Sequence, residues 1–165
     1  EKQPNRFVML STGQIETFRE DGGRDALARA VDVIDSGRCL GIFPEGTRSR
    51  RVSPPLLQPA KTGFARLAAR FPQVPVVPVT MSVGARDFMP PGSKFPKPWK
   101  RIELIVDDPI TFAQWAESAQ GGGIDDGWVD ELMGQTIEDQ QASMRVMYRK
   151  FADQFIETLR IRGAP

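Results

Sequence analysis

Two short segments that are almost entirely apolar, residues 38–43 and 74–83, constrain the fold of this chain most. Strands that are buried on both faces of a sheet have this composition. Apolar residues also recur at helical spacing over residues 25–36 and 64–71, and Pro72 follows as a stop signal. Strands that alternate with helices predict an α/β fold, in which helices flank a mostly parallel or mixed sheet.

The rest of the chain predicts a further strand and a long helix. Residues 102–106 indicate the strand, and residues 139–162 indicate the helix. One stripe of this helix is expected to pack in the core, and it consists of Met144, Tyr148, Phe151, Phe155 and Leu159. Pro75 and Pro78 lie inside the segment 74–83. Because proline cannot donate a hydrogen bond to a ladder, we expect an edge position or a strand end there.

Composition limits the classes of function. The 165 residues suffice for one domain, and the net charge of +1 gives no reason to expect nucleic-acid binding. The single cysteine, Cys39, excludes an internal disulfide and a cysteine-rich metal site, and its apolar neighbours predict a core position. No signal peptide is recognisable, and no stretch approaches the roughly 18 apolar residues that predict a membrane-spanning helix.

Charge is distributed unevenly along the chain. Residues 84–101 contain five basic residues and one acidic residue, mixed with Phe95 and Trp99. This mixture is typical of a surface that meets a membrane, although a solvated loop with its aromatic side chains in the core is the alternative. Residues 107–139 contain nine acidic residues and no lysine or arginine. They lack the spacing of a calcium loop, so we expect a solvated face there.

A charged loop, residues 43–50, directly follows the apolar segment 38–43. Gly46 permits a tight turn and Thr47 offers a hydroxyl group. The planar guanidinium of Arg48 suits a phosphate or a carboxylate, and Glu45 can accept hydrogen bonds. Together these groups would suit a small hydroxylated and phosphorylated ligand. A surface turn with a local Glu–Arg pair is the alternative interpretation.

The sequence Phe-Pro-Glu-Gly-Thr-Arg-Ser at 43–49 resembles the third signature block of the glycerolipid acyltransferases, the 1-acylglycerol-3-phosphate acyltransferases and their relatives. Other segments match the family in order. Residues 13–19 resemble its second block, and residues 61–65 resemble the Lys-x-Gly segment that follows the third. Residues 74–79 resemble the fourth block, and residues 105–110 resemble a later strand.

The decisive departure from the family is that the chain contains no histidine. The family's first block, Asn-His-x-x-x-x-Asp, supplies the base that deprotonates the acceptor hydroxyl, which then attacks an acyl thioester. We therefore expect no catalytic residue in this chain. Since it begins with Glu1, we expect residues 1–165 to be the C-terminal portion of one incomplete acyltransferase-like domain whose catalytic part lies upstream. A relative that has lost the base is the alternative.

The resemblance implies six substrate-binding residues: Arg19, Glu45, Gly46, Thr47, Arg48 and Pro78. The two arginines would bind the acceptor phosphate, residues 45–47 would shape the pocket around the glycerol, and Pro78 would lie beside the acyl chain. In the alternative interpretation, Arg19 is a solvated strand end and Pro78 only terminates a strand.

The expected function is part of an O-acyltransferase that moves a fatty acyl group to a glycerol-phosphate or lysophospholipid acceptor. The donor would be acyl-CoA or an acyl-carrier protein, with no metal or organic cofactor. We expect the protein at the cytoplasmic face of a membrane, peripheral or anchored by an upstream segment. A non-catalytic phosphate- or lipid-binding relative is the alternative.

Overall fold

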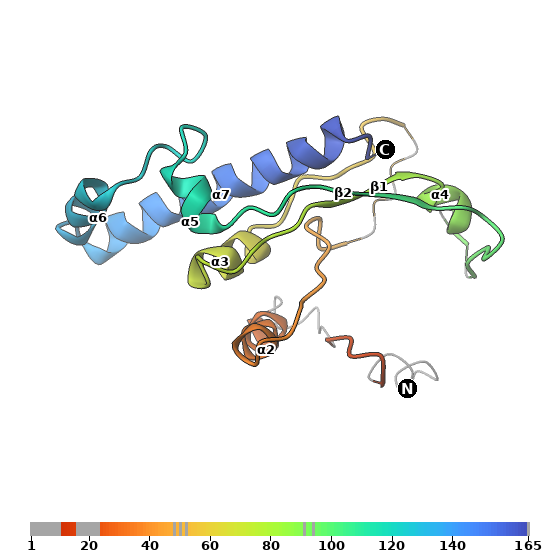
Figure 1. Cartoon of the computed structure of the whole chain (residues 1–165), viewed down its shortest axis with the longest axis horizontal. Coiled ribbons are helices and arrows are strands. Elements are labelled where there is room, and N and C mark those ends of the chain that lie inside the picture. The colour runs from red at the N-terminus through yellow and green to blue at the C-terminus, as the bar shows by residue number, and fades with distance from the viewer. Residues whose placement is uncertain are drawn as a thin grey trace. The chain divides into compact units, whose positions relative to one another are not determined.

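The computed structural model describes residues 11–15, 24–47, 49, 51, 53–90, 92–93 and 95–164. The chain forms two compact units, residues 1–42 and 43–165, which are described separately. Figure 1 shows both units.

In the first unit, α2 spans Arg24–Asp35 and confirms the helix expected over 25–36. Gly37 follows it with φ +73°, the left-handed conformation that commonly ends a helix. The strand predicted over 38–43 is wrong for this structure, since these residues form no ladder and Cys39 is exposed rather than in a core. Apolar composition fits a buried strand, but a strand also needs a hydrogen-bonded neighbour, and no described residue supplies one.

The sheet of the second unit consists of β1, Val79–Val83, and β2, Glu103–Val106, in the described part of the chain. The two strands are antiparallel, and Val79 pairs with Val106. The strand expected over 102–106 is therefore confirmed, and the one expected over 74–83 is confirmed only for residues 79–83. Pro78 lies just before β1, as its missing N–H requires. The mostly parallel or mixed sheet stays a prediction, because one antiparallel pair does not decide it.

Three helices surround the core of the second unit: α3, Gly63–Arg70, α5, Phe112–Glu117, and α7, Ile137–Ile161. The described residues of this unit form two further helices: α4, Ala85–Phe88, inside the stretch expected to be a loop, and α6, Asp126–Met133. Side-chain caps explain where several helices begin. Thr111 forms a capping box with Gln114 at α5, and Thr136 accepts a hydrogen bond from the backbone N–H of Asp139 at α7.

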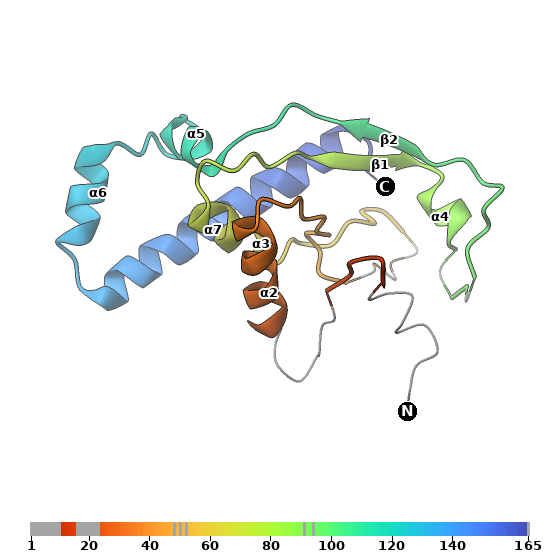
Figure 2. The ribbon, with the colours of Figure 1, turned by 60° about the horizontal axis from the view of Figure 1, so that its bottom comes forward.

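Phe151 on α7 lies at the centre of an aromatic core. Its ring lies 4.8 Å from that of Trp115, 5.3 Å from that of Phe112 and 5.8 Å from that of Phe64, between centroids. Phe155 packs against Phe64 at 5.0 Å. The apolar stripe expected on the last helix is confirmed, since all five of its residues are buried or partly buried. Figure 2 shows α7 running alongside the elements that this core joins.

Candidate functional site

The loop after residue 42 makes a tight turn at Gly46. Its N–H donates to the carbonyl oxygen of Phe43 at 3.0 Å, and its φ is +66°. A side chain at this position would be strained by the backbone conformation, and its Cβ would lie 3.0 Å from Cγ of Lys61. Gly46 and Thr47 are both exposed. The turn therefore leaves the backbone at Gly46 and the hydroxyl of Thr47 accessible to a ligand.

Two hydrogen bonds fasten this loop to the segment before α3. Oε2 of the half-buried Glu45 accepts from the backbone N–H of Gln58 at 2.7 Å. The backbone N–H of Lys61 donates to the carbonyl oxygen of Pro44 at 2.7 Å. The sequence predicted that the Glu45 carboxylate would face a ligand or an arginine. In the structure, one of its oxygens holds the protein's own backbone.

Arg149 on α7 supports the same segment from the other side. Its Nη1 donates to the carbonyl oxygen of the buried Ala60 at 2.9 Å, and its Nε donates to Oδ2 of Asp153 at 2.9 Å. A path of hydrogen bonds thus runs from α7 to residues 58–61 and on to the loop. Sequence reasoning missed Arg149, because its partner lies 89 residues away and no local pattern links the two.

Arg48 and Arg19, the two predicted phosphate contacts, lie outside the described residues. Of the six predicted residues, the structure therefore brings together Glu45, Gly46 and Thr47 in a single turn. Their binding to an acceptor stays a prediction.

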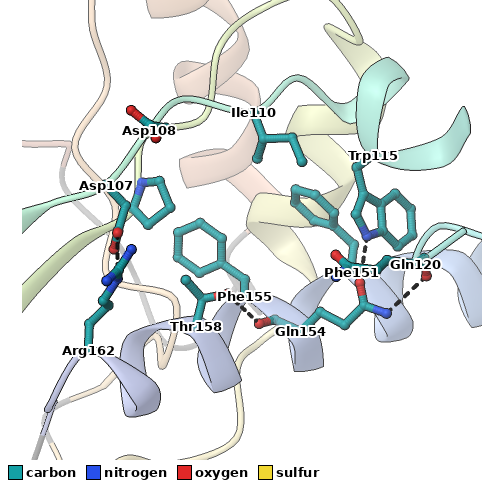
Figure 3. A pocket seen from close by; sticks show the side chains of 11 residues that line it. Asp107, Asp108, Ile110, Trp115, Gln120, Phe151, Gln154, Phe155, Thr158 and Arg162 are labelled. Atoms are coloured by element: carbon teal, nitrogen blue, oxygen red, sulfur yellow. Dashed lines mark hydrogen bonds and ion pairs between the residues drawn. The ribbon is translucent and has the colours of Figure 1, made fainter. Parts of the chain in front are cut away.

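Pro78 lies in a separate hollow of about 270 Å³. None of the residues 45–47 lines it, so the structure does not unite the predicted residues in one pocket. The lining residues, which Figure 3 shows in close-up, are Pro78, Asp107, Asp108, Ile110, Trp115, Gln120, Phe151, Gln154, Phe155, Thr158 and Arg162. Their aromatic members belong to or pack against the core, so the wall beside Pro78 is largely apolar and firmly supported.

Polar groups occupy two places along this hollow (Figure 3). Gln154 accepts a hydrogen bond from Nε1 of Trp115 at 2.6 Å and donates to the carbonyl oxygen of Gln120 at 3.0 Å. At the other end, Nε of Arg162 lies 2.6 Å from Oδ1 of Asp107, whose side chain is only 10% exposed. Oδ2 of Asp107 is buried without a hydrogen-bond partner among the described residues.

Sequence reasoning did not assign these polar residues. Asp107 directly follows a predicted strand, and that position was an available signal for a site residue. Gln154 lies on α7 and Arg162 directly follows it, and the apolar stripe of this helix gave no indication of partners across the fold. Within the described ranges, no group of three or more His, Cys, Asp or Glu side chains could hold a metal ion. None of the described helices is long and apolar enough to cross a membrane.

Comparison with known proteins covers the segment that holds the turn, α3 and Pro78. Residues 3–82 match the family model described as acyltransferase. Over this stretch, which is just under half of the chain, the sequence is similar to the acyltransferase family. The resemblance that its signature blocks indicated is confirmed by this match and by a relative among the glycerolipid acyltransferases.

That relative is the chloroplastic 1-acyl-sn-glycerol-3-phosphate acyltransferase of Brassica napus. It is 36% identical to this chain over 86 residues, which cover 52% of the chain and 24% of the relative. The chain thus spans about a quarter of the length of the relative that it matches. No solved structure matches the chain.

Proposed function

We propose that the intact protein is an O-acyltransferase that transfers a fatty acyl group to a glycerol-phosphate or lysophospholipid acceptor. The observation that carries this proposal is the acyltransferase family match over residues 3–82, which include the turn at residues 43–47. The similarity to a 1-acyl-sn-glycerol-3-phosphate acyltransferase supports the choice of a phosphorylated glycerol acceptor. The donor in this proposal is acyl-CoA or an acyl-carrier protein, and the protein acts at the cytoplasmic face of a membrane.

In this proposal, the acceptor phosphate binds the guanidinium of Arg48 beside the turn, with Arg19 as a second contact. A bidentate arginine–phosphate pair is strong and directional, which would orient the acceptor. The exposed backbone of Gly46 and the hydroxyl of Thr47 are available to the glycerol. The fastening of Glu45 to Gln58 supports this arrangement, because a loop that is held in place binds with a smaller loss of entropy.

The apolar wall beside Pro78 is our proposed contact for part of the acyl chain. Its aromatic lining residues are Trp115, Phe151 and Phe155, and their packing in the core keeps the wall in place.

The chemical step needs a base that the residues of this chain do not provide. The base takes the proton of the acceptor hydroxyl, the oxygen attacks the thioester carbonyl, and the thiolate leaves and is protonated. The 165 residues contain no histidine. We therefore propose that an imidazole from outside residues 1–165 serves as the base, and that this chain alone is inactive.

A non-catalytic phosphate- or lipid-binding protein is the second candidate, and the absence of histidine favours it. The two candidates differ in turnover. The test incubates labelled acyl-CoA with glycerol 3-phosphate or lysophosphatidic acid, and compares the full-length protein with residues 1–165 alone. We expect acyl transfer by the full-length protein only. Transfer by residues 1–165 would refute the proposal of a missing base, and acceptor binding without transfer by the full-length protein would establish the second candidate.

A further inference from the structure

We infer that the loop between β1 and β2, residues 84–101, binds the surface of an anionic lipid bilayer through Phe95 and Trp99. We call this segment the basic–aromatic loop. The inference that this loop binds a bilayer rests on the proposed function in one respect, since a lipid acceptor would reside in a membrane. Figures 1 and 2 show α4 and the rest of this loop at the end of the two strands, away from α5 and α6.

The base of the basic–aromatic loop is closed tightly. Val83 pairs with Glu103, so the chain leaves and re-enters the sheet at neighbouring positions. Gly84 has φ +79°, and a Cβ there would lie 1.8 Å from the carbonyl oxygen of Arg101. Further out, the N–H of Lys97 donates to the carbonyl oxygen of Phe88 at 2.7 Å. These contacts join the two sides of the loop, so its outer part is presented on a defined base.

The two aromatic side chains of the outer part lie outside the core. Phe95 is 77% exposed and Trp99 is 75% exposed. The sequence left open whether they tuck into the core, and the structure excludes that arrangement. The N–H of Lys100 donates to the carbonyl oxygen of Lys97 at 3.0 Å, and this turn places Trp99 between the two lysines. Tryptophan flanked by cations suits the level of the lipid headgroups, where its ring is apolar and its N–H remains hydrated.

Charge complementarity selects an anionic bilayer as the occupant. The loop contains five basic residues and only one acidic residue, whereas the whole chain has a net charge of +1. Arg101 lies 3.6 Å from Glu103 in an exposed ion pair, which offsets part of its charge. Each remaining basic residue near a negatively charged membrane should raise binding about fivefold. A protein partner would more commonly meet aromatic residues without this excess of positive charge.

The test measures binding of the full-length protein to sedimented vesicles. One set of vesicles contains phosphatidylcholine alone, and the other also contains phosphatidylglycerol. The double variant Phe95→Ser/Trp99→Ser should bind anionic vesicles at least about tenfold more weakly, since two apolar contacts with the interface are lost. The matched control is Met133→Ser/Ile137→Ser, because these side chains are 70% and 71% exposed but lie in the acidic part of the chain. The control should bind as the native protein does.

Charge is tested with Lys97→Gln/Lys100→Gln, which should bind the anionic vesicles about 25-fold more weakly and lose about half of the sensitivity to salt. Native-like binding by the Phe95/Trp99 variant, or an equal loss in the Met133/Ile137 control, would overturn the inference. Failure of the native protein to bind either vesicle would overturn it as well.

Acyl transfer to a short-chain, water-soluble acceptor separates this inference from the proposed function. We expect the Phe95/Trp99 variant to retain that activity while it loses vesicle binding. If the native protein shows no acyl transfer but its vesicle binding depends on Phe95 and Trp99, only the proposed function is contradicted. If it transfers acyl groups but binds vesicles equally well without these two side chains, only the inference is contradicted.

Discussion

Arg149 provides the most informative test of how the fold positions the loop at residues 43–47. In Arg149→Ala, the carbonyl oxygen of the buried Ala60 loses its charged donor, and the ion pair with Asp153 is lost too. A hydrogen bond to a charged group contributes about 1.5–3 kcal/mol, and an exposed ion pair contributes about 0.2–1 kcal/mol. We therefore expect the free energy of unfolding to fall by about 2–4 kcal/mol.

Asp153→Ala is the matched control, because it removes the ion pair and leaves the bond from Arg149 to Ala60. It should cost less than about 1 kcal/mol. Urea unfolding followed by circular dichroism measures both values, and a slope of about 2 kcal/mol/M converts the Arg149 loss into a midpoint shift of about 1–2 M. Faster tryptic cleavage within residues 43–51 should accompany the Arg149 variant only. Equal destabilisation by the two variants would refute the role of Arg149 as a brace.

Two further predictions concern the core and the basic–aromatic loop. Phe151→Ala should lower the free energy of unfolding by about 3–5 kcal/mol, because it leaves a cavity among aromatic rings. Urea unfolding measures this loss. The exposed Val146→Ala is the control, and an equally small loss in both variants would contradict the prediction. Gly84→Ala should be clearly more destabilising than Gly92→Ala in thermal unfolding. Both glycines have a positive φ, but of the two only Gly84 is so placed that a Cβ would clash with the backbone of Arg101. Equal melting temperatures of the two variants would therefore show that the base of the loop is not closed.

The sequence was most informative where a local pattern determines the structure. The stripe through Phe151 predicted α7, because a helix that packs on a core must place apolar residues on one face. The missing N–H of proline predicted that Pro78 would lie at a sheet edge or a strand end, and it lies just before β1. Both predictions depend on the covalent structure and spacing of nearby residues, and neither depends on distant partners.

Features that depend on distant residues could not be predicted in this way. The segment 38–43 has the composition of a buried strand, yet it forms no ladder, because pairing requires a neighbour that composition does not specify. Asp107 forms an ion pair with Arg162, although α5, α6 and α7 lie between these two residues in the sequence. Exposure of Trp99 was likewise undecided, since the same loop sequence fits a buried or a solvated aromatic side chain.

The central claim is that the loop at residues 43–48 binds the acceptor phosphate, and the acceptor KM of Arg48→Ala in the full-length protein tests it most directly. Arg51→Ala is the matched control, since the Arg51 guanidinium donates to the carbonyl oxygens of Pro55 and Leu57. Loss of a charged contact of about 1.5–3 kcal/mol predicts a KM about 10- to 150-fold higher for Arg48→Ala. We expect a nearly native KM for Arg51→Ala. An unchanged KM for Arg48→Ala, or an equal rise in both variants, would contradict the account.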